Sequence, residues 1–354
     1  MADPLPAMAT TSMDRTRRRV ALTDGSAFDC RAGETLLMGA LRAGVPLAYS
    51  CNAGCCGCCK VQVLEGGVEA DSNAMSALSA RDLAKNRTLA CQAKPLTDCR
   101  IKGRLEAGPL QAVPPQRHAA RLVSRRDLTP DLVEFHVRTE APAEFHPGQF
   151  AMLSIDGQNI ARAYSMANLP NAEGDWLFQI RQVPGGMVTP RLFAAGVAEY
   201  PSCTLEGPFG LNYYRPTPGR DLVCIAGGSG LAPMLSVARA FAADPGAAGD
   251  RLHFFYGART PSDVCGEFEV AALRERHRGI SYHAVVSDAA AAAKASWSGP
   301  IGFVHAYVDA RLGAALRDHE IYFAGPPAMA EAIQHDLVVG HGIAAGHVHF
   351  DTFW

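Results

Sequence analysis

The chain has 354 residues, 48% of them hydrophobic, which is enough for two or three domains with full cores. A formal net charge of −2 excludes the broad positive field that binds a nucleic-acid backbone, so we expect no nucleic-acid partner. The basic run at residues 15–19 precedes only three apolar residues, too few for a signal peptide, and no apolar stretch reaches the roughly 18 to 20 residues of a spanning helix. We therefore predict a cytoplasmic protein without membrane insertion.

The N-terminal part of the chain predicts a compact α+β domain. Residues 1–16 are polar and interrupted by proline, so we expect a flexible tail. Residues 17–102 contain a short hairpin, a helix at 34–42, a cysteine-rich loop, a strand, a helix with a candidate cap at Ser79–Asp82, and a strand-like return. Glycine and proline are frequent at 103–117, which predicts a linker.

Two further domains follow the linker. Large apolar residues occupy alternate positions at 133–138 and 176–181, as in half-buried antiparallel strands, so residues 118–216 are predicted to form a small antiparallel β-barrel. Within 217–354, apolar strands alternate with helices, which predicts an α/β domain with a doubly wound parallel sheet. The strands expected there are 222–226, 252–256, 280–286, 321–324 and 348–350.

The cysteines point to a cluster of iron and sulfide. Five of the eleven cysteines lie within residues 51–59, a density that suits a metal cluster better than disulfides. Cys51, Cys56 and Cys59 have the spacing C-x4-C-x2-C, and Cys91 follows at a distance, which is the plant-type arrangement for a [2Fe-2S] cluster. Thiolates stabilise iron in both oxidation states, and these four cysteines are the predicted ligands.

Two alternatives remain for this loop. Four cysteines also satisfy a structural zinc site, although such sites usually consist of two short knuckles. Cys55 and Cys58 offer a second ligand set, because with Cys51 they form C-x3-C-x2-C.

Residues 51–66 resemble the ferredoxin domain of bacterial oxygenase reductases. In that family the positions of Cys55 and Cys58 commonly hold Ser, Thr, Gly or Ala. The resemblance implies a β-grasp-like [2Fe-2S] ferredoxin domain over residues 17–102.

The segment 162–168, RAYSMAN, resembles the flavin signature R-x-Y-S of the ferredoxin-NADP reductase superfamily. The resemblance implies that Arg162 pairs with the flavin phosphate, that Tyr164 lies along the isoalloxazine or ribityl, and that Ser165 hydrogen-bonds near the reactive flavin nitrogen. Each side chain suits its role, since a planar cation pairs with phosphate and an aromatic ring packs on a flat ring system. The resemblance implies FAD, with FMN less favoured, and makes Ser165 a predicted catalytic residue.

The segment 181–189, RQVPGGMVT, follows a strand and opens a helix, which is a phosphate-binding arrangement. Gly185 and Gly186 would let a phosphate approach helix amides, and Thr189 would add a hydroxyl. All three are predicted to bind cofactor.

A second glycine turn follows the strand at 222–226. Gly227, Gly228, Ser229 and Gly230 lead into an apolar helix with an early proline, an anion-binding geometry at the place where a doubly wound sheet binds its ligand. These four residues are predicted to bind the nicotinamide nucleotide, and a tight structural turn is the alternative. The segment is not the G-x-G-x-x-G fingerprint, so ordinary dehydrogenase function does not follow.

Arg259 ends the next strand, where the superfamily selects the adenosine ribose. Arg259 would meet a 2′-phosphate, whereas Asp263 would repel one. We therefore expect NADH, with NADPH as the alternative.

The segment 322–329, YFAGPPAM, resembles the family's C-G-P-P element beside the nicotinamide. The resemblance implies that Gly325 and Pro326 bind cofactor. Ala324 replaces the usual cysteine, which removes one proposed contact to the hydride path.

The ending at 350–354 resembles the acidic-x-aromatic terminus that shields the flavin face in this family. Phe353 is therefore predicted as a catalytic and cofactor-binding residue, with Trp354 as the second choice. Simple packing of a terminal aromatic residue is the alternative.

The three sets of motifs occur in the order ferredoxin, flavin barrel, nicotinamide domain. The chain thus resembles reductase components of bacterial aromatic-ring oxygenases, of the naphthalene or benzoate dioxygenase type, with reductases of di-iron monooxygenases as the alternative. The resemblance implies hydride transfer from NAD(P)H to FAD, then single electrons to the [2Fe-2S] cluster and on to a terminal oxygenase or an intermediary ferredoxin. A flavin is needed because it accepts two electrons and releases them singly. A non-enzymatic sensor that binds a metal and a nucleotide is the rival from another class.

Overall fold

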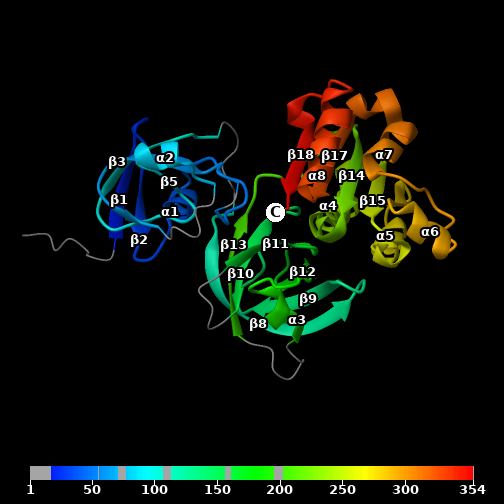
Figure 1. Ribbon diagram of the computed structural model, residues 1–354, viewed down its shortest axis with the longest axis horizontal. Helices are drawn as coiled ribbons and strands as arrows, with labels where there is room; N and C mark the ends of the chain where they lie inside the picture. The colour runs from blue at the N-terminus through cyan, green and yellow to red at the C-terminus, as the bar shows by residue number, and fades with distance from the viewer. Residues whose placement is uncertain are drawn as a thin grey trace, which may run out of the picture. The chain divides into compact units, whose positions relative to one another are not determined.

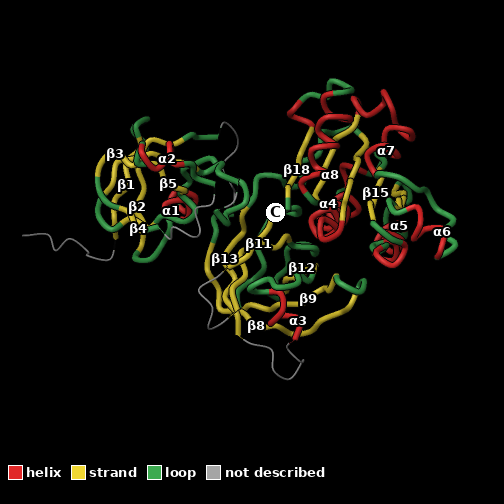
Figure 2. Tube along the Cα trace, in the orientation of Figure 1, coloured by secondary structure: helices red, strands yellow, loops and turns green. Residues whose placement is uncertain are grey.

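The computed structural model describes residues 17–54, 56–70, 77–106, 113–155, 161–194 and 202–353. The predicted tail, Cys55 and Trp354 lie outside these residues. Contacts within the chain define two compact units, residues 1–49 with 57–110 and residues 50–56 with 111–354. Figure 1 labels the helices and strands of each unit, and Figure 2 colours them by type.

The first unit contains a five-stranded mixed sheet in the order β2-β1-β7-β3-β5. Strands β1 and β7 are parallel and the other neighbours are antiparallel. Helix α1 packs against β2 and buries its leucines, so this small unit has a core of its own. The elements are β1 (Arg17–Leu22), β2 (Ala27–Arg31), α1 (Leu36–Arg42), β3 (Lys60–Glu65), β4 (Val68–Glu69), α2 (Ala80–Ala84), β5 (Arg87–Leu89), β6 (Lys94–Pro95) and β7 (Cys99–Gly103).

The predicted cap at Ser79–Asp82 is confirmed at the start of α2. The Ser79 hydroxyl accepts a hydrogen bond from the Asp82 amide at 3.2 Å, and the Asp82 carboxylate accepts one from the Ser79 amide at 3.1 Å. This reciprocal capping box satisfies two amides of the first turn. Lys60 Nζ and Arg87 Nη1 lie 3.0 and 2.9 Å from the same carboxylate, so Asp82 also ties α2 to β3 and β5.

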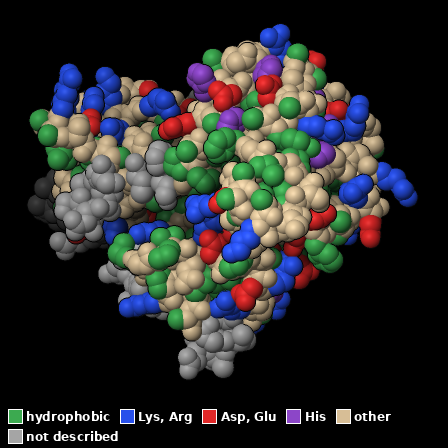
Figure 3. Space-filling model, turned by 45° about the vertical axis from the view of Figure 1, so that its right-hand side comes forward, with side chains coloured by type: hydrophobic (Ala, Val, Ile, Leu, Met, Phe, Trp, Pro, Cys, Tyr) green, Lys and Arg blue, Asp and Glu red, His purple; other side chains and the backbone are tan. Residues whose placement is uncertain are grey.

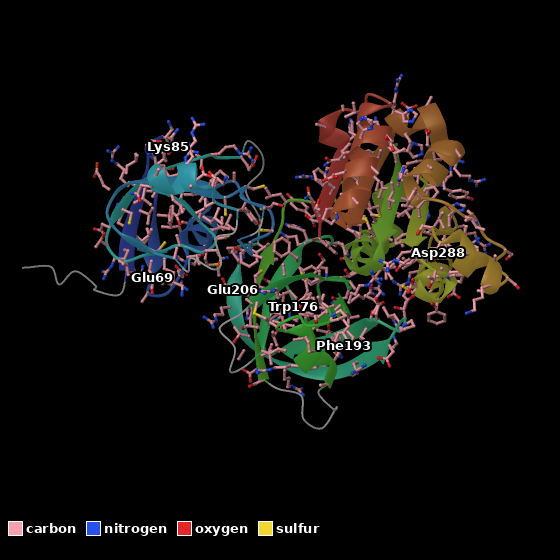
Figure 4. All side chains as sticks on the ribbon, in the orientation of Figure 1. Glu69, Lys85, Trp176, Phe193, Glu206 and Asp288 are labelled. Atoms are coloured by element: carbon pink, nitrogen blue, oxygen red, sulfur yellow. The ribbon has the colours of Figure 1, made fainter. Side chains whose placement is uncertain are left out.

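The second unit begins with a six-stranded antiparallel sheet in the order β11-β10-β13-β8-β9-β12. A bridge between Met166, just after β11, and Phe178 of β12 joins the two ends of this order, so the sheet curls into the predicted barrel. Trp176 lies inside the barrel, fully buried, and donates a hydrogen bond from Nε1 to Thr139 Oγ1 at 3.0 Å (Figure 4). The elements are β8 (Gln116–Asp127), β9 (Leu132–Thr139), β10 (Phe150–Ile155), β11 (Ala161–Ser165), β12 (Asp175–Arg181), α3 (Thr189–Ala194) and β13 (Ser202–Phe209).

The same unit ends with a five-stranded parallel sheet in the order β16-β15-β14-β17-β18. Helices α4, α5 and α6 pack on one face of this sheet, and α7, α8 and the π-helix η7 pack on the other (Figure 1). The predicted doubly wound parallel sheet is therefore confirmed. Its strands are β14 (Asp221–Gly227), β15 (Leu252–Ala258), β16 (Ile280–Val286), β17 (His319–Gly325) and β18 (Val348–Thr352). Its helices are η3 (Gly228–Gly230), α4 (Leu231–Ala243), η4 (Pro245–Ala247), η5 (Pro261–Asp263), α5 (Glu267–Arg274), α6 (Ala289–Lys294), α7 (Val304–Leu312), η6 (Gly313–Asp318), α8 (Pro327–Ala332), η7 (Ile333–Val339) and η8 (Ala345–His347).

The surface carries both signs of charge. Lys and Arg side chains are interspersed with Asp and Glu on the face shown in Figure 3. Among the described residues, no helix has the length and apolar character needed to cross a bilayer.

Candidate functional site

Cys59 and Cys91 meet beside the sheet of the first unit. Cys59 directly precedes β3 and Cys91 follows β5, and these strands pair Lys60 with Leu89. The two sulfur atoms consequently lie 3.3 Å apart, and both side chains are buried. This contact places two predicted ligands together at the end of the strand pair.

Cys51 and Cys56 belong to the segment 50–56, which groups with the second unit. The Ala53 amide donates a hydrogen bond to Cys51 Sγ at 3.4 Å, which is the kind of contact that stabilises a cluster thiolate. A hydrogen bond with Cys56, and then burial, raise the pKa of the Cys51 thiol. A bound metal ion would displace the thiol proton and so lower the pKa again.

The alternative ligand set, which includes Cys55, stays a prediction. Cys58 is exposed, whereas its neighbour Cys59 is buried against Cys91, and Cys55 lies outside the described residues. The thiols of Cys51, Cys56, Cys59 and Cys91 suit the soft iron of a [2Fe-2S] cluster.

The R-x-Y-S residues lie on β11 along the edge of the barrel. Antiparallel pairing with β10 sets Ser165 opposite Phe150 and Arg162 opposite Leu153. Ser165 is buried, and its hydroxyl makes no hydrogen bond to the described residues. Tyr164 is half-buried, and burial raises the pKa of its phenol to about 12, so it stays neutral. Arg162 is half-exposed, with one hydrogen bond from Nη1 to the Ala161 carbonyl at 3.0 Å.

The turn after β12 uses its threonine internally. Gly185 adopts a φ of 72°, which favours glycine, and nothing lies within 4 Å of the Cβ that another residue would add. The Thr189 hydroxyl accepts a hydrogen bond from the Val183 amide at 3.0 Å and lies 3.2 Å from the Val183 carbonyl. The Thr189 hydroxyl therefore shapes the turn in which Gly185 and Gly186 lie, and its role at a cofactor stays a prediction.

Helix α4 connects the flavin segment to the parallel sheet. Ser236 Oγ donates a hydrogen bond to the Asn168 carbonyl at 2.7 Å, and the guanidinium of Arg239 donates one to the Ala167 carbonyl. Ala167 and Asn168 follow shortly after Ser165, the last residue of R-x-Y-S. The helix begins at the second glycine turn, so it links the two predicted cofactor segments.

The glycine turn at the end of β14 is packed too closely for side chains. A Cβ on Gly230 would lie 2.0 Å from the Ala324 carbonyl oxygen of β17. Gly228 has a φ of 56°, and a Cβ there would lie 3.0 Å from Arg181 Nη1. Ser229, between them, is half-buried, and its hydroxyl makes no hydrogen bond to the described residues.

A cleft of about 250 Å³ opens over this turn, at the carboxyl edge of the sheet. Parallel sheets of this kind bind their ligands at that edge. The predicted residues Gly227, Gly228, Arg259 and Pro326 line it, together with Asp131, Arg181, Tyr256, Gly257, Ala258, Asp263, Ser287, Gly302, Phe303, Val304 and Met329.

Arg181 is a residue of this cleft that the sequence analysis missed. Its Nε lies 3.1 Å from Asp131 Oδ2, which holds the guanidinium over Gly228. The position of Arg181 in the sequence could have predicted this, because it is a cation at the end of a strand, shortly before the turn with Gly185 and Gly186.

Arg259 and Asp263 face the same cleft, as a ribose-selecting pair requires. Arg259 is exposed, and the Asp263 carboxylate accepts hydrogen bonds from the Thr260 amide and hydroxyl at 2.9 and 2.8 Å. The Asp263 charge is therefore fixed near the rim.

The C-terminal residues lie at the carboxyl edge of the parallel sheet. Strand β18 pairs with β17, and the Phe353 amide donates a hydrogen bond to the Gly325 carbonyl at 3.0 Å, which brings two predicted cofactor residues together. The Phe353 ring is partly buried against the core under α4. Burial raises the pKa of Asp351 to about 6, while a hydrogen bond from Asn212 Nδ2 at 3.0 Å opposes the shift.

Three family models match the chain. They describe a 2Fe-2S iron-sulfur cluster binding domain at residues 22–96, an oxidoreductase FAD-binding domain at 119–214 and an oxidoreductase NAD-binding domain at 224–335. The matches occur in the predicted order.

Whole-length relatives carry the same arrangement. The ferredoxin–NAD(P)(+) reductase CarAd of Metapseudomonas resinovorans is 39% identical over 328 residues, which cover 92% of this chain and 96% of that protein. The ferredoxin–NAD(+) reductase component of the alkene monooxygenase system of Xanthobacter autotrophicus is 35% identical, covering 94% and 99%. The solved structure of the ferredoxin reductase in carbazole 1,9a-dioxygenase has a TM-score of 0.85 at 35% identity, covering 96% of this chain and 98% of that one.

Proposed function

We propose that this chain, which belongs to the family of ferredoxin–NAD(P)+ reductase components of bacterial oxygenase systems, donates electrons to a Rieske-type aromatic-ring dioxygenase, directly or through a separate ferredoxin. It is an oxidoreductase with [2Fe-2S], FAD-binding and NAD-binding domains. When bound, FAD takes a hydride from the nicotinamide and supplies single electrons to the cluster. The oxidoreductase domains favour this enzyme over a sensor.

The flavin is held, in this proposal, by the residues of β11, which are half-buried or buried. Arg162 is half-exposed and pairs with the flavin phosphate, and the neutral Tyr164 packs along the ring system. Ser165 offers a buried hydroxyl without a partner among the described residues, which suits a hydrogen bond to the ring nitrogen that changes protonation.

The nicotinamide nucleotide occupies the cleft at the carboxyl edge of the parallel sheet. The amides around Gly228 and Ser229, at the start of a 13-residue helix, bind the diphosphate, and Arg181 adds a positive charge over the same turn. Gly325 and Phe353, joined by a hydrogen bond, close the nicotinamide end. Asp263 at the rim disfavours a 2′-phosphate, so NADH is the proposed donor.

The [2Fe-2S] cluster is held by Cys51, Cys56, Cys59 and Cys91. The contact between Cys59 and Cys91 and the Ala53 amide at Cys51 support this set. A cluster held by these four cysteines would supply single electrons, which suit an oxygenase or a ferredoxin that accepts one electron at a time.

One observation carries the proposal most directly. Helix α4 begins at the nucleotide turn and binds the carbonyls that follow R-x-Y-S, so one element positions both the donor site and the flavin site. This contact supports a protein that uses the two sites together, as an oxidoreductase does and a nucleotide sensor does not.

Optical spectroscopy of the purified protein tests the proposal. Flavin bands and a reddish-brown cluster absorbance should appear, and NADH should bleach both. Protein that is folded, prepared without oxygen, and contains neither flavin nor inorganic sulfide would refute it.

A di-iron monooxygenase is the second candidate acceptor, because a 35%-identical relative is the reductase of an alkene monooxygenase system. Steady-state reduction of a purified Rieske dioxygenase, its ferredoxin and a di-iron monooxygenase, compared by kcat/KM, separates the two. A kcat/KM at least tenfold higher with the monooxygenase would identify the monooxygenase as the electron acceptor.

A further inference from the structure

Three metal-ligating side chains gather at the end of the parallel sheet that lies opposite the cofactor cleft. Asp221 is the first residue of β14, His253 the second of β15 and His319 the first of β17. The proposed cofactor residues Gly227 and Gly325 are the last residues of two of these strands. Nothing in the proposed electron transfer uses this cluster.

The strand register puts all three side chains on one face. Asp221 pairs with His319, and Val223 pairs with His253. Side chains of paired residues in parallel strands point to the same side, and residues two apart, such as Asp221 and Val223, share a face. One ligand atom from each of the three residues lies within 4.8 Å of the others.

Hydrogen bonds orient both imidazoles. His319 Nδ1 lies 2.7 Å from the Ala315 carbonyl, which can only accept, so Nδ1 carries the proton and Nε2 keeps its lone pair. His253 Nδ1 lies 3.1 Å from Ser281 Oγ, whose own proton is directed to the Leu252 carbonyl at 3.5 Å. Each histidine thus has the fixed tautomer that metal-binding histidines usually have.

The carboxylate is also held, and the cluster is accessible. Asp221 Oδ1 accepts a hydrogen bond from the Arg251 amide at 2.7 Å. The Arg251 side chain, with Nε 3.4 Å from Oδ2, is 70% exposed and can turn away from an incoming cation. His319 is buried, whereas Asp221 and His253 are half-buried, so an ion can enter from solvent.

We propose that Asp221, His253 and His319 bind one divalent transition-metal ion of the Zn²⁺ class. Two imidazoles and one carboxylate suit Zn²⁺, Co²⁺ or Ni²⁺ better than Mg²⁺ or Ca²⁺, which prefer oxygen ligands. With metal–ligand bonds of about 2.0 to 2.1 Å in a tetrahedral site, two ligand atoms of one ion lie about 3.3 Å apart, so binding closes the present spread of 4.8 Å or less by up to about 1.5 Å. Water fills the remaining coordination position.

The bound ion would connect the starts of three adjacent strands. Because the cluster lies at the opposite end of the strands from the cofactor cleft, the ion stabilises the nicotinamide domain without taking part in electron transfer. A ligand that binds only the folded state raises the unfolding temperature, and the size of the rise follows the ratio of free ion to dissociation constant.

The test uses the full-length protein loaded with cluster and flavin. Iron and flavin contents are measured first, because cysteines without iron would also bind Zn²⁺. Zn²⁺ binding is measured by equilibrium dialysis and elemental analysis for the wild type, His253→Gln, His319→Gln and the control His335→Gln. His335 is 85% exposed and lies outside the cluster. Thermal unfolding with and without excess Zn²⁺ supplies a second readout.

We expect one Zn²⁺ per chain in the wild type and the control, at least tenfold weaker binding in His253→Gln and His319→Gln, and a rise in unfolding temperature that only the wild type and the control show. Unchanged Zn²⁺ affinity in both cluster variants, or no Zn²⁺ bound by the wild type, would overturn the proposal. If His319→Gln does not fold because this residue is buried, the Zn²⁺ affinity of His253→Gln, at a half-buried position, decides the test.

Discussion

Replacing Gly230 by alanine tests whether the glycine turn of the parallel sheet sets the position of the nucleotide. The added Cβ would lie 2.0 Å from the Ala324 carbonyl oxygen, whereas real Cβ atoms essentially never approach within 3.0 Å, so the turn must move by at least the 1.0 Å difference (3.0 − 2.0 Å). The opposing atom is backbone of β17, which cannot rotate away. A misplacement of about 1 Å at a positioning element costs on the order of 100-fold in rate, or about 2.7 kcal/mol.

The assay is NADH-driven ferricyanide reduction, which needs the nucleotide and flavin sites only. We expect kcat/KM for NADH to fall by about 100-fold in Gly230→Ala, while iron and flavin contents stay at the wild-type level. Gly249→Ala is the matched control, because nothing lies within 4 Å of the added Cβ. A folded Gly230→Ala protein with kcat/KM within twofold of the wild type would show that the turn does not position the nucleotide.

Three other predictions address separate parts of the protein. Cys51→Ser should abolish electron transfer to protein acceptors and preserve ferricyanide reduction, whereas Cys58→Ser should preserve both; loss of both activities in folded Cys51→Ser would contradict the proposed electron path. Arg181→Met should raise KM for NADH by roughly 10-fold or more, since a charged hydrogen bond contributes about 1.5 to 3 kcal/mol, and an unchanged KM in stopped-flow and steady-state assays would remove Arg181 from the nucleotide site. Hydrogen bonds from Ser79, and then Arg87 and Lys60, lower the pKa of Asp82, so its ionised form stabilises the fold above the unfolded pKa of about 3.9 and this contribution is lost as pH falls towards the folded value. Asp82→Asn should therefore lower the thermal midpoint at pH 7 by more than at pH 3, and an equal difference at both pH values would refute the assignment.

Local patterns predicted the strands and caps of this chain well. Alternation at 133–138 corresponds to β9, and alternation at 176–181 corresponds to β12, because one face of each strand is buried in the barrel. The helix predicted from residue 34 begins instead at Leu36, since Thr35 is its cap and accepts a hydrogen bond from the Met38 amide at 3.2 Å. Residue 34 is a glutamate that pairs with Arg42 at 2.9 Å. The sequence therefore indicated the helix, and tertiary contacts set its first residue.

Side-chain direction was harder to predict than the position of motifs. Arg181 lines the cleft at the carboxyl edge of the sheet, where its Nε lies 3.1 Å from a carboxylate oxygen of Asp131, a residue 50 positions earlier in the chain. The sequence also did not indicate that the Thr189 hydroxyl accepts a hydrogen bond from the Val183 amide within its own turn. The grouping of Asp221 with His253 and His319 depends on the strand order of the sheet, which no short motif encodes. Such contacts are long-range, so periodicity and spacing do not reveal them.

The hydrogen bonds of helix α4 have a consequence for chimeric reductases. Ser236 and Arg239 bind the carbonyls of Asn168 and Ala167, so a nicotinamide domain is fitted to the flavin segment of its own chain. Both acceptors are main-chain carbonyls, so a parallel sheet taken from a relative keeps this contact only if its helix carries matching donors at the positions of Ser236 and Arg239. In such hybrids the two donor side chains of α4 matter more than the side chains of residues 167 and 168.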